Sequence, residues 1–299
     1  MKAKISSIIL VVFTLFTFLS CATIANIGAV LGEATGLINA DTAAAISKAG
    51  VSIEKAFERI TPEQEYYIGR AVGANVLSMY RLQTNMPAMT DYANKICNAL
   101  IINSVRPEIF NGYHVGILDS DEINAFATPG GHILITRGLI NCATSEDTLA
   151  AVIAHEVSHI QLEHGLKAIK SSRATQAAMD TLNSAAGAVT GVQLEQITQS
   201  FGVSVNEIVN TMVTNGYSQK QEYDADSMAM ALLSLAGYRP SSLIDMLRVL
   251  EKEQPGRGGG FNKTHPTPAR RITNANKTVG KYSDTNTSSY RTERFASVI

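Results

Sequence analysis

Two histidines four residues apart, His155 and His159, are the residues of this chain whose type and spacing most favour chemistry. With Glu156 between them they form the pattern H-E-x-x-H. On a helix, positions i and i+4 lie on one face, so both imidazoles can bind a single metal ion. Glu156 would then lie beside the metal, where a base for a metal-bound water has to be. The pattern predicts two ligands and a base of a hydrolytic metal site.

The third ligand of such a site has to come from elsewhere in the chain. Catalytic zinc usually takes three protein ligands and keeps a fourth position for water. A histidine six residues after His159 would complete one such set, but that position is Gly165. His164 follows His159 by five residues, and at about 100° per residue it points away from the metal face of a continuous helix. We interpret His164 as a structural side chain or as one that supports a ligand.

Glu222 is the best candidate for the missing ligand. It begins the sequence E-Y-D-A-D near the start of a predicted helix, and a carboxylate with two histidines is a known catalytic set. Asp226 is one turn further along the same face, where it could accept the second N–H of a metal-bound imidazole. Without H-E-x-x-H in the same chain, a solvent-exposed acidic face would be the better interpretation of both acids.

Both halves of this site have helix signals of their own. Thr144 with Asp147 fits a capping box before H-E-x-x-H, and Gly165 is a natural stop after it. Ser218 with Gln221 forms another capping box, which should begin the helix of Glu222. The first helix has one apolar stripe, formed by Leu149, Val152, Ile153, Val157 and Ile160.

Strands and further helices are expected around these two segments. The runs at 113–118 and 132–136 have the composition of short strands, and we expect them to pair in a small sheet beside the metal helix. The strand at 132–136 is expected to hold an extended peptide as an added strand. Helices are expected from Thr61 to about Tyr80, from Met89 to Ile102, from Ser218 to about Ala236 with Gly237 closing it, and from Ser242 to Glu253.

Three segments have no clear catalytic signal. Residues 166–216 form an insertion rich in small residues, with apolar positions at helical spacing. A packed helical hairpin is our main interpretation, because Ser204 and Glu207 fit a fresh capping box, and a flexible gate over the site is the alternative. A glycine-rich loop at 255–260 precedes His265, which could therefore swing in and out. The tail from Lys281 is polar and has no readable motif.

The N-terminus has the layout of a secretory signal peptide. Two lysines precede an apolar run that ends at Leu19, followed by small residues. The run is short for a transmembrane anchor, which needs about 20 apolar residues. Cleavage is plausible after Ala22, or before Cys21, which would then become lipid-modified as in a bacterial lipoprotein. We expect the lipoprotein type, with residues 1–20 as the signal peptide and 21–55 as a lead segment.

Composition and charge exclude one class of partner. The 299 residues have a formal net charge of −1, which becomes more negative once the two lysines of the signal peptide are removed. A nucleic-acid-binding protein would show a basic excess, so no nucleic-acid partner is expected. With Cys21 as the lipid site, Cys97 and Cys142 remain. In an oxidising compartment they are either a disulfide or two buried thiols, and the sequence leaves both readings open.

Several motifs occur in an order that resembles a known family. They are Asn124-Ala125-Phe126-Ala127, then H-E-x-x-H with His164 five residues later, then E-x-x-x-D as Glu222 and Asp226, then His265-Pro266 with Arg271 six residues after His265. Over roughly residues 60 to 280, the chain resembles the M48 family of zinc metallopeptidases, which are gluzincins. It looks closest to the secreted bacterial group that includes outer-membrane lipoprotein proteases.

The resemblance implies roles for these residues. It implies that His155, His159 and Glu222 bind one zinc ion per chain and that Glu156 is the catalytic acid and base. It implies that Asn124, His265 and Arg271 contact the substrate or the transition state. In some relatives the histidine that matches His265 can instead reach the zinc and block it.

The expected fold is α+β, a predominantly helical zincin-like metallopeptidase domain at 56–280. Its small β-sheet has an edge strand that flanks the active-site helix, and residues 281–299 form a tail. The expected function is a zinc-dependent endopeptidase of the bacterial cell envelope, which hydrolyses misfolded or unassembled proteins through a zinc-bound water activated by Glu156. We expect unfolded or extended polypeptides as substrates, and a periplasmic location with an outer-membrane anchor through a lipid on Cys21. The alternatives are a zinc-stabilised envelope chaperone or assembly lipoprotein with little proteolytic activity, and a chance H-E-x-x-H in a structural lipoprotein.

Overall fold

The computed structural model describes residues 21–35, 40, 43–44, 47, 59–169, 205–253, 260–265, 268–284 and 289–298. The signal peptide predicted at 1–20, residues 170–204 of the predicted insertion and most of the glycine-rich loop lie outside the described residues. Residues 205–209, which the capping pair at 204 and 207 predicted to be helical, are helical. The chain forms two compact units, residues 1–59 with 169–200, and residues 60–168 with 201–299. The first contains helix α2 (Cys21–Ala34). Among the described residues, no helix combines the length and the apolar character needed to cross a membrane.

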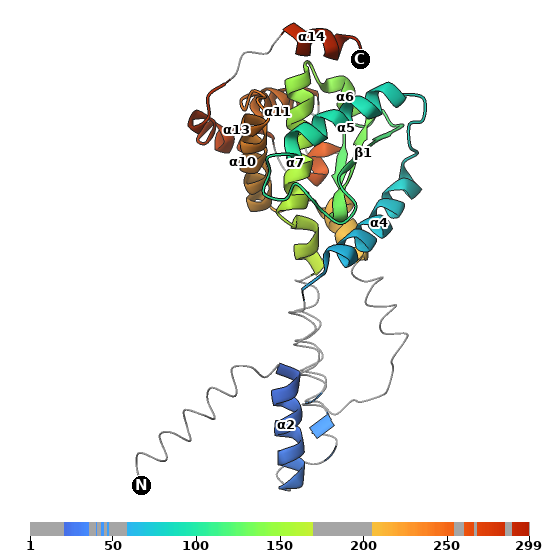
Figure 1. Ribbon diagram of the computed structural model, residues 1–299, viewed down its shortest axis with the longest axis vertical. Helices are drawn as coiled ribbons and strands as arrows, with labels where there is room; N and C mark the ends of the chain where they lie inside the picture. The colour runs from blue at the N-terminus through green and yellow to red at the C-terminus, as the bar shows by residue number, and fades with distance from the viewer. Residues whose placement is uncertain are drawn as a thin grey trace. The chain divides into compact units, whose positions relative to one another are not determined.

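The second unit is mostly helical and contains a three-stranded sheet, so the predicted α+β class is confirmed. Its helices are α4 (Pro62–Met79), α5 (Pro87–Ile101), α6 (Arg137–Cys142), α7 (Glu146–Gln161), α10 (Gln219–Leu235), α11 (Ser242–Glu253), α12 (Phe261–Thr264), α13 (Pro268–Asn276) and α14 (Ser289–Ala296). Short turns of other helix types are η1 (Pro129–Gly131), η2 (Asn210–Asn215) and η3 (Val279–Lys281). In Figure 1, α7 runs through the middle of this unit, with α10, α11 and α13 on one side and β1 and α5 on the other.

The sheet has the strand order β1-β3-β2. β1 (His114–Leu118) pairs with β3 (His132–Thr136), as predicted, and the two strands are parallel. β2 (Ala125–Ala127) pairs antiparallel with the other side of β3. The prediction that 132–136 holds an extended peptide is wrong, because both edges of this central strand already carry backbone hydrogen bonds. The strand beside α7 at the edge of the sheet is β2, which the sequence pattern did not reveal because it has only three residues.

Helix α7, which contains H-E-x-x-H, is buried on every side, whereas the sequence predicted a single apolar stripe. All sixteen of its residues are buried, and alanines at positions 150, 151 and 154 allow close packing around it. The predicted cap at Thr144 is wrong by one residue. Ser145 is the N-cap, and its side chain and that of Thr148 each accept a hydrogen bond from the other residue's backbone N–H. This reciprocal capping ties the first turn of the helix to the preceding loop.

The end of α7 also differs from the prediction. The helix ends at Gln161, and Glu163 adopts φ 55°, a left-handed conformation uncommon for a residue other than glycine. Gly165 is therefore not the helix stop. A Cβ atom on Gly165 would lie 3.2 Å from Cγ of Pro129, so its small size serves the close approach of the chain to η1.

The caps of two other helices are as predicted. Thr61 and Gln64 form a capping box at the start of α4, and Ser218 and Gln221 form one at the start of α10. Gly237 follows the end of α10 with φ 74°, as a helix-closing glycine does. These capping signals depend only on neighbours three or four residues away, which explains their success.

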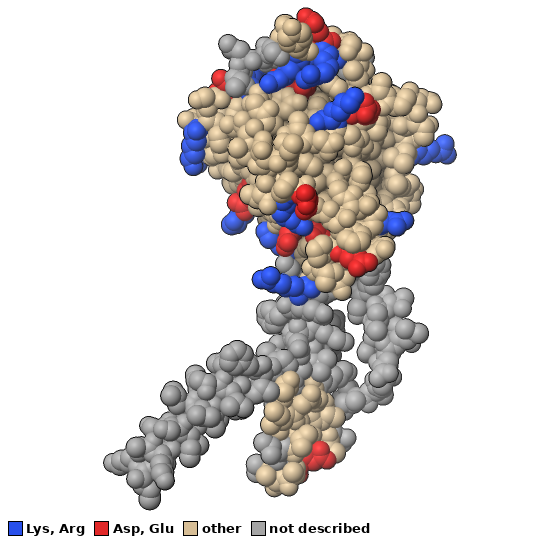
Figure 2. Space-filling view, in the orientation of Figure 1, with Lys and Arg blue, Asp and Glu red and all other residues tan. Residues whose placement is uncertain are grey.

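The C-terminal tail has a structural role that the sequence analysis missed. Arg294 of α14 donates to both carboxylate oxygens of Glu146, at 2.9 and 2.5 Å. Arg291 donates to Asp147 at 2.9 Å. The two acids are in the first turn of α7 and are almost fully buried, so the tail neutralises charge at the start of the active-site helix. Figure 2 shows Lys and Arg side chains gathered beside α14, whereas most of this face carries few charges.

Cys97 and Cys142 are both free thiols, so the disulfide reading does not hold in this structure. Cys97 is fully buried on α5, and burial raises the pKa of its thiol to about 12. Burial also raises the pKa of Cys142. Both thiols are therefore protonated at neutral pH.

Candidate metal centre

Three predicted ligand side chains meet where α7 packs along α10. The Nε2 atoms of His155 and His159 lie 3.1 Å apart. Glu222, in the first turn of α10, places Oε1 3.4 Å from Nε2 of His159 and Oε2 3.5 Å from Nε2 of His155. All three side chains are buried. Folding thus brings together the two imidazoles and the carboxylate that the sequence analysis selected.

A fourth donor, His265, joins this set. Its Nδ1 atom lies 3.0 Å from Oε1 of Glu222 and 3.3 Å from Nε2 of His155. One ligand atom from each of the four residues lies within 4.8 Å of the others. The ring of Phe261 stacks on His265 at a centroid distance of 4.2 Å and holds the imidazole in this position.

The donor set fits a zinc ion. With bonds of about 2.0–2.1 Å in tetrahedral geometry, donor atoms should be roughly 3.3 Å apart, which is close to the spacing of the four donors here. Oε2 of Glu222 is buried, and its nearest cationic neighbour among the described residues is Nη1 of Arg271 at 3.1 Å. Burial raises the pKa of Glu222, but the charges of His265 and Arg271 outweigh burial and hold it well below its usual range. The carboxylate is therefore ionised and available as a ligand.

Asp226 orients the first histidine. Its Oδ1 atom is 3.0 Å from Nδ1 of His155, so the contact expected between this carboxylate and an imidazole N–H is present. Burial raises the pKa of Asp226, but the charge of Arg271 outweighs it and lowers the value overall. An anionic acceptor on Nδ1 directs the Nε2 lone pair of His155 toward the ligand set.

Arg271 lies within the protein beside the acids of α10. It donates to Asp226 from Nε at 2.9 Å and from Nη2 at 2.6 Å, and Nη1 is 3.1 Å from Oε2 of Glu222. The side chain is 2% exposed. The guanidinium is thus engaged by these carboxylates, and the geometry favours a role in positioning them.

His164 contacts a ligand, contrary to the direction expected on a continuous helix. Its Nδ1 atom lies 2.9 Å from Nδ1 of His159. The break at Glu163 causes this, because the left-handed residue turns the chain back toward the metal face. Burial and the charge of Lys167 lower the pKa of His164 to about 4, so the neutral ring can accept the Nδ1–H of His159. The interpretation of His164 as a side chain that supports a ligand agrees with this contact.

Glu156 lies beside the ligands without joining them. Its side chain is buried, and neither carboxylate oxygen has a hydrogen-bond partner in the part of the chain that the structure describes. Nε2 of His265 lies 3.7 Å from Oε1. Burial raises the pKa of Glu156, and the opposing charges of His265 and His155 only partly offset this. A carboxylate with a raised pKa is a stronger proton acceptor than an ordinary one, which suits a general base.

Asn124 connects the edge strand to the segment that carries His265. Its Oδ1 atom accepts from Oγ1 of Thr264 at 3.2 Å and from its neighbour Ala125 N at 2.9 Å. The backbone N–H of Phe261 also donates to the carbonyl of Ile123 at 2.7 Å. Asn124 therefore holds residues 261–265 against β2 rather than reaching the ligands.

Tyr217 is the main site residue that the sequence analysis missed. Its ring stacks on the imidazole of His159, with centroids 4.1 Å apart and planes at 21°. It stands immediately before the N-cap Ser218, a position where an apolar side chain often packs against its helix. That local signal could have drawn attention to Tyr217, but its contact with His159 depends on how α10 packs on α7.

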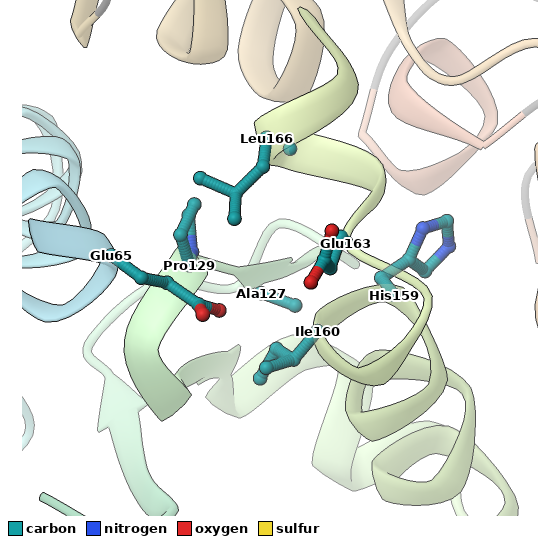
Figure 3. A pocket seen from close by; sticks show the side chains of 8 residues that line it. Glu65, Ala127, Pro129, His159, Ile160, Glu163 and Leu166 are labelled. Carbon is teal, nitrogen blue, oxygen red and sulfur yellow. The ribbon is translucent and has the colours of Figure 1, made fainter. Parts of the chain in front are cut away.

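A small recess lies next to His159. Four apolar side chains and one glycine line it together with two acids: Ala127, Pro129, Ile160, Gly165 and Leu166, with Glu65 and Glu163. Figure 3 shows the Glu163 carboxylate between His159 and Glu65. The recess adjoins the end of β2, so the edge strand and the ligand set border the same space.

Comparison with known families finds one match that covers most of the chain. The family model described as peptidase family M48 matches residues 87–279. The matched segment contains every candidate ligand, Glu156 and Tyr217. It leaves out α4 before it and α14 after it.

Curated relatives carry peptidase names. The chain is 30% identical over 190 residues to "Metalloprotease LoiP" of Escherichia coli (strain K12), which covers 63% of this chain and 71% of that protein. It is 26% identical over 220 residues to "Beta-barrel assembly-enhancing protease" of the same organism, covering 71% of this chain and 42% of that protein. It is 25% identical over 226 residues to "Mitochondrial metalloendopeptidase OMA1" of Schizosaccharomyces pombe, covering 74% of this chain and 63% of that protein. The matched region thus spans less than half the length of the beta-barrel assembly-enhancing protease.

Proposed function

The chain belongs to peptidase family M48, and from this we propose that it is a zinc-dependent endopeptidase of the bacterial cell envelope that hydrolyses misfolded or unassembled proteins. The observation that carries the proposal is the buried carboxylate of Glu156, which has no hydrogen-bond partner among the described residues and lies 3.7 Å from His265 of the ligand set. A purely structural zinc site needs no such carboxylate. A hydrolytic site needs a base there.

In the proposed site, His155, His159 and Glu222 hold the ion. Zinc bound by these residues supplies Lewis acidity, which polarises the peptide carbonyl and acidifies water. Asp226 and His164 keep the two imidazoles oriented through their Nδ1 atoms.

Glu156 carries the proton through the reaction. It takes a proton from the attacking water while the water oxygen adds to the peptide carbonyl carbon. It then gives that proton to the leaving nitrogen as the C–N bond breaks. The products are a carboxylic acid and an amine, and Glu156 returns to its starting state. The raised pKa of this buried carboxyl suits both transfers.

The substrate is proposed to lie along β2 as an added strand. β2 is an edge strand next to α7, and its far side pairs with β3. An extended peptide can pair with the backbone of such an edge, whereas a folded helix cannot. This geometry supports unfolded or extended polypeptides as substrates.

His265 is proposed to hold the site in a self-inhibited state. Its Nδ1 atom occupies a donor position in the ligand set, 3.0 Å from Glu222, where water and substrate would have to enter. The segment that carries it is fastened by hydrogen bonds from Phe261 to Ile123 and from Tyr217 to Thr264. Residues 261–265 therefore have to shift before hydrolysis begins.

The envelope location and the lipid anchor rest on the N-terminal sequence. The basic start, the apolar run and Cys21 have the order of a bacterial lipoprotein signal. We propose a periplasmic protein attached to the outer membrane through Cys21. Mass spectrometry of the mature N-terminus checks this, because an unmodified Cys21 or an intact residue 1 would contradict it.

Replacement of Glu156 tests the function. In Glu156→Gln we expect unchanged zinc content and a loss of casein hydrolysis of about 100-fold or more, since a general base contributes roughly 10²–10⁴-fold. Glu251→Gln, at an exposed carboxylate of α11, is the matched control and should behave as wild type. Full activity of Glu156→Gln would refute the mechanism. Rescue of an envelope defect by Glu156→Gln in cells would favour the zinc-stabilised chaperone instead.

A further inference from the structure

The hydroxyl of Tyr217 is a buried hydrogen-bond donor without a partner. The residue is 5% exposed, and among the described residues no atom accepts from or donates to its hydroxyl oxygen. A buried hydroxyl without a partner is costly. Phenylalanine would give the same ring without that cost. The hydroxyl therefore points to a partner that arrives from outside the chain.

The surroundings of Tyr217 identify where that partner binds. Its ring contacts three histidines of the site, with centroids 4.1 Å from His159, 5.8 Å from His164 and 6.0 Å from His265. Its backbone N–H donates to the carbonyl of Thr264 at 3.0 Å. Tyr217 is thus held on one side by His159 of α7 and on the other by the segment that carries His265.

The hydroxyl of Tyr217 suits the step of peptide hydrolysis in which water adds to the carbonyl group. An ordinary phenol has a pKa of about 10 and is a hydrogen-bond donor at neutral pH. When water adds to a peptide carbonyl, the carbonyl oxygen gains negative charge and needs donors. The other neutral groups beside the ligand set, the rings of Phe261 and His164, do not offer a hydroxyl, and Arg271 is engaged by Asp226.

We propose that Tyr217 is a catalytic residue whose hydroxyl donates to the carbonyl oxygen of the scissile peptide bond, while its ring fixes the plane of the His159 imidazole. The proposal rests on the proposed peptidase function and names a further residue of the same site. It predicts two separable effects. Loss of the hydroxyl weakens binding of the transition state, and loss of the ring weakens binding of zinc.

Three variants of the full-length protein separate these effects. Tyr217→Phe keeps the stacked ring and removes the hydroxyl. Tyr217→Leu removes both. Tyr223→Phe is the matched control, since Tyr223 is in α10, the helix that follows Tyr217, and its hydroxyl accepts from Gln219 at 2.6 Å, outside the ligand set.

The expected results differ for each variant. In Tyr217→Phe, kcat for a casein-derived peptide falls about 100-fold with little change in KM, as for the loss of one oxyanion donor. The affinity for a phosphinic analogue of that peptide falls by a similar factor, whereas zinc affinity and Tm do not fall. In Tyr217→Leu, zinc affinity measured by chelator competition falls about tenfold. Tyr223→Phe matches wild type in all of these measurements.

The overturning results are equally specific. The role of the hydroxyl is refuted if Tyr217→Phe keeps the wild-type kcat and the wild-type affinity for the phosphinic peptide. Wild-type zinc affinity in Tyr217→Leu refutes the role of the ring. If the wild-type protein itself binds zinc but cleaves no peptide, the proposed function fails. The phosphinic peptide and the chelator titration then still decide whether Tyr217 acts on an oxyanion and on His159.

Discussion

Replacement of Gly69 by alanine tests how α4 is held against the turn that precedes β3. A Cβ atom at position 69 would lie 1.6 Å from the carbonyl oxygen of Pro129 and 2.6 Å from its carbonyl carbon. An ordinary contact begins at 3.4 Å, so the helix and the turn would have to separate by about 2 Å. The turn cannot yield easily, because Gly130 in the same turn already lies against the backbone of Tyr66 on α4.

Gly73, one turn later on α4, is the matched control. A Cβ atom there would meet nothing within 4 Å. Alanine is a better helix former than glycine by about 0.5–1 kcal/mol, and this gain applies at both positions. Overpacking costs about 1–3 kcal/mol and sometimes more. Because both obstacles at Gly69 are backbone atoms, we take the upper end of that range.

The expected difference between the two variants is therefore about 3 kcal/mol. Gly69→Ala should lose about 2 kcal/mol or more in the free energy of unfolding, and Gly73→Ala should gain about 0.5–1 kcal/mol. For a domain of this size the loss corresponds to a fall in Tm of about 4–8 °C. Urea denaturation and calorimetry measure both quantities. Equal effects of the two substitutions would refute the backbone contact between α4 and the turn.

Two further predictions concern charge and inhibition. Burial raises the pKa of Glu146, but hydrogen bonds from Arg294, Tyr92 and Tyr238 outweigh burial and lower it overall. The stability contributed by Glu146 is then fully present above the carboxyl's ordinary value of 4.5 and is lost as the pH falls below it. Urea midpoints between pH 6 and pH 3 should fall less steeply in Arg294→Gln than in wild type, and an unchanged slope would contradict the assignment. In His265→Ala the initial rate of casein hydrolysis should rise several-fold because a donor leaves the ligand set, whereas a fall at unchanged zinc content would show that His265 assists catalysis.

The sequence alone determined the local parts of this protein. The spacing of His155, Glu156 and His159 brings both imidazoles to one face only on a helix, and α7 is that helix. The capping boxes at Thr61 and Ser218 predicted the starts of α4 and α10. These features depend on neighbours three or four residues apart, whose geometry is nearly the same in every helix.

The sequence pattern did not reveal the short strand β2 or the break in the helix after α7. β2 has three residues and becomes an edge strand only by pairing with β3, so the sequence pattern did not place β3 at the centre of the sheet. The contact of His164 with His159 depends on the left-handed backbone at Glu163. A hydrophobic pattern does not reveal such a backbone, because glutamate adopts it only where the surrounding packing requires it.

Only the tertiary structure decided which distant residues meet. Residue types selected Glu222, but the packing of α10 on α7 places its carboxylate within 3.5 Å of both imidazoles. The same packing puts Tyr217 on His159, and the fastening of residues 261–265 puts His265 among the ligands. The ion pair of Arg294 with Glu146 joins the tail to the start of the active-site helix. Such contacts depend on the relative placement of whole helices, which burial of apolar surface sets and which local spacing does not encode.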